Sequence, residues 1–366
     1  MGKITDFASK LYSPPFEKEL LVIKTKHPID HSPEPKFINQ LIKLLKRHLV
    51  LFVFFQYRYL KKKISVGQKR ILWIHNTTEN IGDSLMKTSS IRYLKANGYS
   101  VDLCVAEKFF DLYRNNSFCS NVLKIESLSG SNANYDLIIL DALSSKCIKI
   151  KMKYFYSKPF VTIYEFFNYY RADYNLIYFS WHRVQYLIDK AESIDKIARP
   201  FVGKSTDDNL INLNFTNNTL AIVCGGINDF RTYPHWVEVI SLIDINEQSK
   251  IPIVLVGSDN GVKYADEIVN TFKDRGQLVN CVGKYTLSES KSIISKCNMI
   301  IGPDGGILQI ASAFDKKIIA LFAQIDCKLR FTEATDYICL YDEKAVENIN
   351  PEDIANSVIS EVRAKS

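Results

Sequence analysis

The feature that most constrains this chain is a rhythm of short apolar runs alternating with segments of helical spacing. The first half of the chain has four such runs, at 70–75, 101–106, 122–125 and 135–140. A helical pattern follows the first run from Ser84 to Asn97, and a shorter one lies at 109–116. Strands that are apolar on both faces and alternate with helices are typical of a parallel sheet covered by helices on both sides.

The same rhythm restarts after the polar stretch 204–219. The second half has apolar runs at 220–224, 252–257, 278–283, 298–302 and 317–322. With 366 residues, 46% of them hydrophobic, the chain is long enough to bury two cores of ordinary domain size. We therefore predict an α/β protein with a basic amphipathic N-terminal extension (1–68), a Rossmann-like domain (69–210) and a second Rossmann-like domain ending in a helix (211–366). Two such doubly wound domains would face each other across a cleft at the carboxyl ends of their strands.

Positive charge is concentrated in one segment. Residues 36–70 contain ten Lys or Arg and no Asp or Glu, and because the whole chain has a formal net charge of +7, the remainder carries −3. The apolar centre of this segment, 49–55, is too short to cross a bilayer core, which needs about 20 residues. One hypothesis is a basic helix that lies in the headgroup region of an anionic membrane. The alternatives are a helix packed on the first domain with solvated basic ends, and, less favoured because no base-reading motif accompanies the charge, a nucleic-acid surface.

Two glycine-containing loops in the second half are suited to binding an anion. The strand at 298–302 leads into Asp304, Gly305 and Gly306, where a helix begins, so that free N–H groups and the helix dipole converge. The other loop follows the strand at 220–224 and contains Gly225, Gly226 and Arg231, whose guanidinium can bind phosphate in a bidentate manner. The alternative for the first loop is a tight turn with Asp304 as a helix N-cap. Two such loops in one sheet favour a nucleotide diphosphate.

The first half has a comparable loop after its first strand. The stretch Asn76–Asn80 is polar and is followed by Ile81, Gly82 and Asp83 at the start of a helix. Taken alone, Asp83 is better explained as an ordinary helix cap.

These motifs together resemble glycosyltransferase family 9, the ADP-heptose:lipopolysaccharide heptosyltransferases. The resemblance rests on Ile-Gly-Asp near the start of the first domain, on Gly-Gly, Arg-x-Tyr-Pro and His-Trp at the start of the second, and on Asp-Gly-Gly-x-x-Gln-x-Ala near its end. It extends over roughly residues 70 to 345 and leaves out the basic extension. It implies the GT-B fold, with the acceptor bound mainly by the first domain and the donor mainly by the second.

The resemblance also implies roles for individual residues. Asp83 matches the aspartate that serves as general base, and it would face a donor held across the cleft by Arg231 and the Asp304 loop. The implied donor-binding residues are Gly225, Gly226, Arg231, Lys284, Tyr285, Asp304, Gly305, Gly306 and Gln309. His182 resembles the His-x-Val stretch that closes the first domain.

Two departures from the family pattern affect the donor. Gln309 occupies the position of a usual histidine, and Phe322–Ile325 lacks the glycine and threonine of the family's loop. The interpretation we favour is an inverting enzyme that moves heptose or a related sugar from ADP-heptose, or another nucleotide-diphosphate sugar, to a lipopolysaccharide or other surface glycan. The alternatives are a relative with another donor sugar or a protein acceptor, and a nucleotide-binding or scaffold protein without catalysis.

The acceptor candidates lie in the first domain. The stretch 154–186 has 14 aromatic residues, which indicates either a buried core or rings that stack on sugars. We name as acceptor candidates Asn80, His182, Tyr169, Tyr170 and Arg171.

No metal or other cofactor is predicted, because no Asp-x-Asp motif lies in a suitable loop and an arginine with a helix start can stabilise a departing diphosphate. Eight scattered cysteines without metal-ligand spacing fit a reducing compartment. We therefore expect a cytoplasmic protein, with a peripheral position on the inner face of the inner membrane through residues 36–70.

Overall fold

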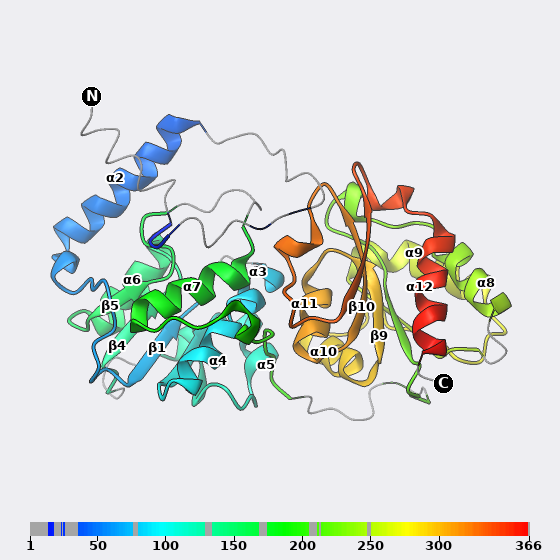
Figure 1. Ribbon diagram of the computed structural model, residues 1–366, viewed down its shortest axis with the longest axis horizontal. Helices are drawn as coiled ribbons and strands as arrows, with labels where there is room; N and C mark the ends of the chain where they lie inside the picture. The colour runs from blue at the N-terminus through cyan, green and yellow to red at the C-terminus, as the bar shows by residue number, and fades with distance from the viewer. Residues whose placement is uncertain are drawn as a thin grey trace. The chain divides into compact units, whose positions relative to one another are not determined.

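The chain forms two compact units in the computed structural model, and each is described by itself. Unit 1 comprises Met1–Lys24 and Asp30–Ala198, and unit 2 comprises Thr25–Ile29 and Arg199–Ser366 (Figure 1). The structure describes residues 14–17, 23, 25, 36–75, 80–128, 134–167, 174–204, 211, 214–246 and 250–364.

Unit 1 contains a five-stranded parallel sheet. Its strands are β1 (Arg70–Ile74), β2 (Ser100–Val105), β3 (Asn121–Lys124), β4 (Leu137–Leu140) and β5 (Phe160–Thr162), in the order β3-β2-β1-β4-β5. Its helices in sequence are α3 (Ile81–Met86), α4 (Ser89–Ala96), α5 (Glu107–Tyr113), α6 (Ser145–Phe155) and α7 (Leu176–Ile188). The chain passes outward from β1 to β3 and returns on the other side of β1, so the strand order reverses between β1 and β4. Ligands bind at such switch points in doubly wound sheets.

The basic segment packs on unit 1. Its helix α2 (Phe37–Val53) buries Leu44 and Leu51, and Leu51 joins the core formed by β1, β4 and α6. After the 3-10 turn η2 (Gln56–Arg58), the Lys61 N–H donates to the Phe160 carbonyl at 2.8 Å and the Ile64 N–H donates to the Leu187 carbonyl at 2.7 Å. In the part of the chain that the structure describes, no helix is long and apolar enough to cross a membrane.

Unit 2 contains a six-stranded parallel sheet. Its strands are β6 (Leu220–Val223), β7 (Ile253–Val256), β8 (Leu278–Asn280), β9 (Met299–Pro303), β10 (Lys317–Ala323) and β11 (Tyr337–Asp342), in the order β11-β10-β9-β6-β7-β8. Its helices are α8 (Trp236–Asn246), α9 (Val262–Thr271), α10 (Leu287–Lys296), α11 (Gly306–Ala313) and α12 (Pro351–Arg363). The terminal helix α12 packs against α8 and shares its core (Figure 1). Here the strand order reverses between β6 and β9.

One predicted helix is wrong in its extent. The helix expected from Ser84 to Asn97 begins three residues earlier, at Ile81, and is interrupted after Met86. The interruption has a local cause, because the Thr88 hydroxyl donates to the Leu85 carbonyl at 2.7 Å and Lys87 forms a buried ion pair with Asp141. The break separates a short helix containing Asp83 from α4, which packs against α7.

Candidate functional site

Asp83 stands at the switch point of unit 1, in the first turn of α3. The N-cap of this helix is Asn80, which is exposed and has an extended backbone, so Asp83 is not the cap residue. Its side chain is half-buried. Residues 76–79 of the predicted loop lie outside the described residues. A carboxylate in this position, at the carboxyl end of β1 and partly open to solvent, can accept a proton from a bound hydroxyl group.

A chain of hydrogen bonds connects α3 to β1 and α5. His75, directly after β1, has its Nδ1 3.1 Å from the Ser84 hydroxyl, and that hydroxyl lies 2.7 Å from the Tyr113 hydroxyl of α5. All three side chains are buried. Burial lowers the pKa of His75 to about 4, with Asp141 opposing the decrease and Lys87 adding to it. His75 is therefore neutral at physiological pH. Its hydrogen bond to Ser84 ties the residue after Asp83 to the end of β1.

A buried ion pair fixes the other end of α3. The Lys87 Nζ lies 2.8 Å from Asp141 Oδ2, and both side chains are fully buried. The indole N–H of Trp73 donates to Asp141 Oδ1 at 2.6 Å. Burial alone would raise the pKa of Asp141, but the charge of Lys87 and the hydrogen bonds from Lys87 and Trp73 hold that pKa below its usual range. Because Asp141 follows β4, this pair joins the two strands of the switch point to the segment containing Asp83.

The acceptor candidates of unit 1 have different outcomes. His182 lies on α7, which contacts α3, and it is only 8% exposed. Burial lowers the pKa of His182, and its Nε2 has no hydrogen-bond partner among the described residues. Tyr169, Tyr170 and Arg171 lie outside the described residues.

Most of the described aromatic residues of the stretch 154–186 are packed in the core. The buried ones are Phe155, Phe160, Tyr164, Phe167, Tyr178, Phe179 and Trp181. The interpretation of the stretch as core is confirmed for these residues.

In unit 2, the loop after β6 requires its two glycines. Gly225 has a φ of +82°, a conformation that side chains other than glycine's rarely adopt. A Cβ on Gly226 would lie 2.2 Å from the Arg231 carbonyl oxygen. The Asn260 side chain, in the loop after β7, donates a hydrogen bond to the Gly226 carbonyl at 2.5 Å. The glycines therefore let the chain fold tightly back, and the 3-10 turn η5 (Asp229–Arg231) presents Arg231 beside the switch point.

Arg231 and Asp304, predicted from separate loops, form an ion pair. Arg231 NH1 lies 3.2 Å from Asp304 Oδ2, and Arg330 Nε lies 3.5 Å from the same oxygen. The Asp304 side chain is 7% exposed. Two guanidinium groups around one carboxylate leave a net charge of +1, and the buried Nε of Arg231 has no hydrogen-bond partner among the described residues. This cluster is suited to a phosphate, which would bring both charge and hydrogen-bond acceptors.

The helix start beside this cluster is open. The N-cap of α11 is Gly305, so Asp304 is not the cap, and a Cβ on Gly305 would meet only the Pro303 carbonyl oxygen, at 3.8 Å. The N–H groups in the first turn of a helix have no partner within it, and their dipoles favour an anion. Gly306 begins α11, and one turn further on the buried Gln309 donates to the Arg330 carbonyl at 3.0 Å. Its Oε1 has no hydrogen-bond partner among the described residues.

Lys284 and Tyr285 lie farther along the same edge of the sheet. They follow β8 and precede α10, whose N-cap Thr286 forms a capping box with Glu289. Lys284 is exposed and donates to the Asn280 carbonyl at 2.9 Å, while Tyr285 is half-buried. Because β8 is two strands from β6 and neighbouring strands lie about 4.8 Å apart, this pair stands roughly 10 Å along the edge from the Gly225–Gly226 loop.

Sequence reasoning missed Arg330 and the network around Asp141. Arg330 follows the 3-10 turn η7 (Cys327–Leu329) after β10 and has no local motif to mark it. Asp141 could have been suspected, since a charged residue directly after an apolar strand often faces a site. Among the described residues, no group of three or more His, Cys, Asp or Glu is arranged to hold a metal ion.

Each of the two units carries a parallel sheet whose strand order reverses at a switch point, an arrangement typical of the GT-B fold. A sequence model of glycosyltransferase family 9 (heptosyltransferase) matches residues 172–350. This match covers a little under half of the chain and confirms the resemblance inferred from the motifs.

Solved structures agree with this fold. The glycosyltransferase family 9 protein from Veillonella parvula DSM 2008 aligns with a TM-score of 0.64 and 12% identity over 82% of this chain and 99% of its own. E. coli ADP-heptose lps heptosyltransferase II aligns with a TM-score of 0.61 and 16% identity, over 80% and 99%. E. coli heptosyltransferase WaaC with ADP-2-deoxy-2-fluoro heptose aligns with a TM-score of 0.57 and 14% identity, over 81% and 100%. At these identities the similarity is one of fold, and it confirms the predicted GT-B class. Among curated protein sequences, none matches the chain significantly.

Proposed function

We propose that this chain is an inverting, metal-independent glycosyltransferase. It moves heptose or a related sugar from a nucleotide-diphosphate donor, with ADP-heptose as the leading candidate, to a lipopolysaccharide, lipooligosaccharide or other surface-glycan acceptor. The choice of donor is supported by the solved heptosyltransferase WaaC, whose structures contain ADP or an ADP-heptose analogue.

The main support is the pair of arginines on Asp304. Asp304 orients Arg231 and Arg330 beside the open start of α11, and the cluster keeps one unit of positive charge. Departure of a nucleotide diphosphate leaves negative charge on the phosphate that loses the sugar. Fixed guanidinium and N–H groups that already point at this charge stabilise the transition state without reorganisation.

In this proposal Asp83 is the general base. The acceptor hydroxyl attacks the anomeric carbon from the side opposite the diphosphate, its proton passes to the Asp83 carboxylate, and the glycosidic bond forms with inversion. An aspartate is ionised at neutral pH and needs only the correct position. The hydrogen bonds beneath α3 restrict the movement of the helix that bears it. Asn80 and His182 remain acceptor candidates from the neighbouring elements.

The donor's remaining contacts follow the edge of the unit 2 sheet. Gly225, Gly226 and Gly306 let the diphosphate approach the backbone, and Gln309 offers its free Oε1 to a sugar hydroxyl. Lys284 and Tyr285 flank the adenine. A lipid-linked acceptor requires work at a membrane surface, and the proposal therefore includes a peripheral position on the inner face of the inner membrane, in a cytoplasmic enzyme.

The proposal is tested with nucleotide sugars carrying ADP, GDP or UDP and with truncated lipooligosaccharide as acceptor. The native chain is compared with Asp83→Asn and with Asp111→Asn, which removes an exposed carboxylate from the same unit. We expect Asp83→Asn to lower transfer at least a hundredfold while ADP affinity, measured by calorimetry, stays the same. Asp111→Asn should behave as the native chain, and EDTA should have no effect.

Unchanged transfer by Asp83→Asn would remove the base assignment. Nucleotide binding without turnover of any donor would favour the scaffold alternative.

A further inference from the structure

The outward side of α2 is apolar although the helix already packs on unit 1. Its buried side contains Gln40, Leu44 and Leu51. Large exposed apolar side chains recur at helical spacing on another side of the same helix: Ile38, Ile42, Leu45, Leu49, Phe52 and Val53. Residues three and four apart share one side of a helix, so these residues form a continuous strip, which we call the apolar strip.

Exposed hydrophobic residues are concentrated on and directly after α2. Of the 17 large hydrophobic residues that are exposed in the described part of the chain, ten lie between Phe37 and Tyr57. Leu49 is 60% exposed and Phe52 is 73% exposed. A contiguous apolar patch of this kind marks an interaction surface, whereas single exposed hydrophobic residues need no explanation.

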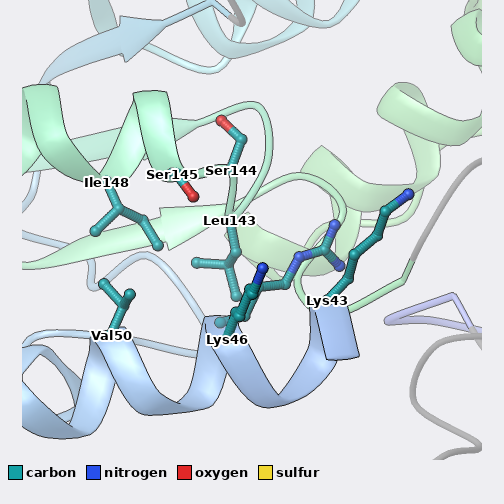
Figure 2. A pocket seen from close by; sticks show the side chains of 8 residues that line it. Lys43, Lys46, Val50, Leu143, Ser144, Ser145 and Ile148 are labelled. Carbon is teal, nitrogen blue, oxygen red and sulfur yellow. The ribbon is translucent and has the colours of Figure 1, made fainter. Parts of the chain in front are cut away.

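A pocket of basic residues borders the apolar strip. Its volume is about 160 Å³, and it lies between α2 and the start of α6. Figure 2 shows Lys46 of α2 pointing toward the segment with Leu143 and Ser144 that precedes α6, while Lys43 extends to one side of it. Arg47 completes the basic lining and anchors the pocket to unit 1 by donating to the Phe166 carbonyl at 2.9 Å.

The pocket has the size and charge for a phosphate group. A water molecule takes about 30 Å³ in the liquid, so the space holds a group several times larger. Three cationic side chains line it, and the first turn of α6 contains no acidic residue. The surrounding segment 36–70 has ten Lys or Arg and no Asp or Glu. An anionic phospholipid is complementary to both features, because its acyl chains can contact the apolar strip and its phosphate can bind in the basic pocket.

We propose that α2 is a docking surface for an anionic lipid bilayer, with the apolar strip inserted at the level of the acyl chains and a lipid phosphate bound by Lys43, Lys46 and Arg47. The inference rests on the proposed function, because an enzyme that acts on a lipid-linked acceptor must bind at a membrane. Its test measures lipid binding without turnover, so that failure of docking and failure of the enzymatic proposal are distinguishable.

The test is co-sedimentation of the full chain with vesicles of phosphatidylglycerol and phosphatidylethanolamine, compared with phosphatidylcholine vesicles. We expect binding to the anionic vesicles that weakens with added salt. Lys43→Gln with Lys46→Gln should lower the partition coefficient about 25-fold, from roughly fivefold for each cation removed near the surface. The charge-matched control is Lys196→Gln with Lys263→Gln, at two exposed lysines outside this segment, and it should bind as the native chain does.

The apolar strip is tested by Leu49→Ser with Phe52→Ser, which should abolish binding to the anionic vesicles while the circular dichroism spectrum is retained. Its control is Ile227→Ser with Ile245→Ser, at two apolar residues of unit 2 that are more exposed than Leu49 and Phe52, and it should have no effect. The proposal is overturned if the native chain does not bind anionic vesicles or if neither variant of α2 weakens binding. It is also overturned if sedimentation velocity shows a dimer that Leu49→Ser dissociates, because a second copy would then occupy the strip.

Discussion

Protonation of the buried His75 should destabilise unit 1 in mildly acidic solution. Burial lowers the pKa of this imidazole from 6.5 to about 4. As the pH falls, the unfolded chain therefore binds a proton before the folded chain does, and stability is lost between pH 6.5 and about 4. From pH 7.5 to 4.5 the loss attributable to His75 is about 2.5 kcal/mol, at roughly 1.4 kcal/mol per unit of pKa difference.

The measurement compares the native sequence with His75→Asn, whose amide can still bond to Ser84 but does not titrate. The two units can unfold separately, so the probe must report unit 1 alone. Of the three tryptophans, Trp73 and Trp181 lie in unit 1 and Trp236 in unit 2. Urea unfolding followed by fluorescence in a Trp236→Phe background therefore isolates unit 1.

We expect the free energy of unfolding to fall by about 2.5 kcal/mol more in the native chain than in His75→Asn over this range. Comparing pH profiles removes the constant cost of the substitution itself. Parallel profiles for the two proteins would refute the reasoning, because they would mean that His75 titrates alike in the folded and unfolded chains.

Two further predictions concern packing that the site depends on. Lys87→Met leaves Asp141 buried without its cation and should lower the free energy of unfolding of unit 1 by about 3–5 kcal/mol in the same fluorescence assay. The double variant Lys87→Met with Asp141→Leu should lower it by less, because no unpaired charge remains buried. A loss below about 1 kcal/mol in the single variant would contradict this prediction. Gly226→Ala places a methyl group 2.2 Å from the Arg231 carbonyl oxygen, so the turn bearing Arg231 must shift and ADP affinity by calorimetry should fall at least tenfold. Gly276→Ala, in open space, is the matched control, and equal affinities in the two variants would argue against a role of this turn.

The sequence predicts those elements whose burial leaves a periodic pattern. Central strands such as β1, β4, β6 and β9 are covered on both faces, so they read as uninterrupted apolar runs. The loops at their carboxyl ends could be located for the same reason. The edge strand β11 is only half-buried along its length and gives no such run, and β5 has three residues inside an aromatic-rich stretch. Neither was predicted.

Contacts between distant parts of the chain could not be predicted. The sequence indicates that Lys87 is a surface residue of a continuous helix, and only the structure shows that Asp141, directly after β4, lies 2.8 Å away. Arg330 likewise becomes part of the site only because β10 lies beside β9 and returns the following turn to Asp304. The local pattern could name Arg231 and Asp304 as separate candidates, while their pairing depends on β6 and β9 being neighbours in the sheet.

Gln309 bears on the choice between an enzyme and an inactive relative. In the sequence, glutamine at a position where the family usually has histidine favours loss of catalysis, because the amide cannot transfer a proton. In the structure its Nε2 donates to the Arg330 carbonyl, and Arg330 is the second guanidinium on Asp304. Under the proposed function, Gln309 therefore positions the positive cluster that stabilises a departing diphosphate, a task for which an amide is as suitable as an imidazole N–H. The substitution removes one reason to regard the chain as a scaffold, and it leaves Asp83 as the residue on which the enzymatic proposal depends.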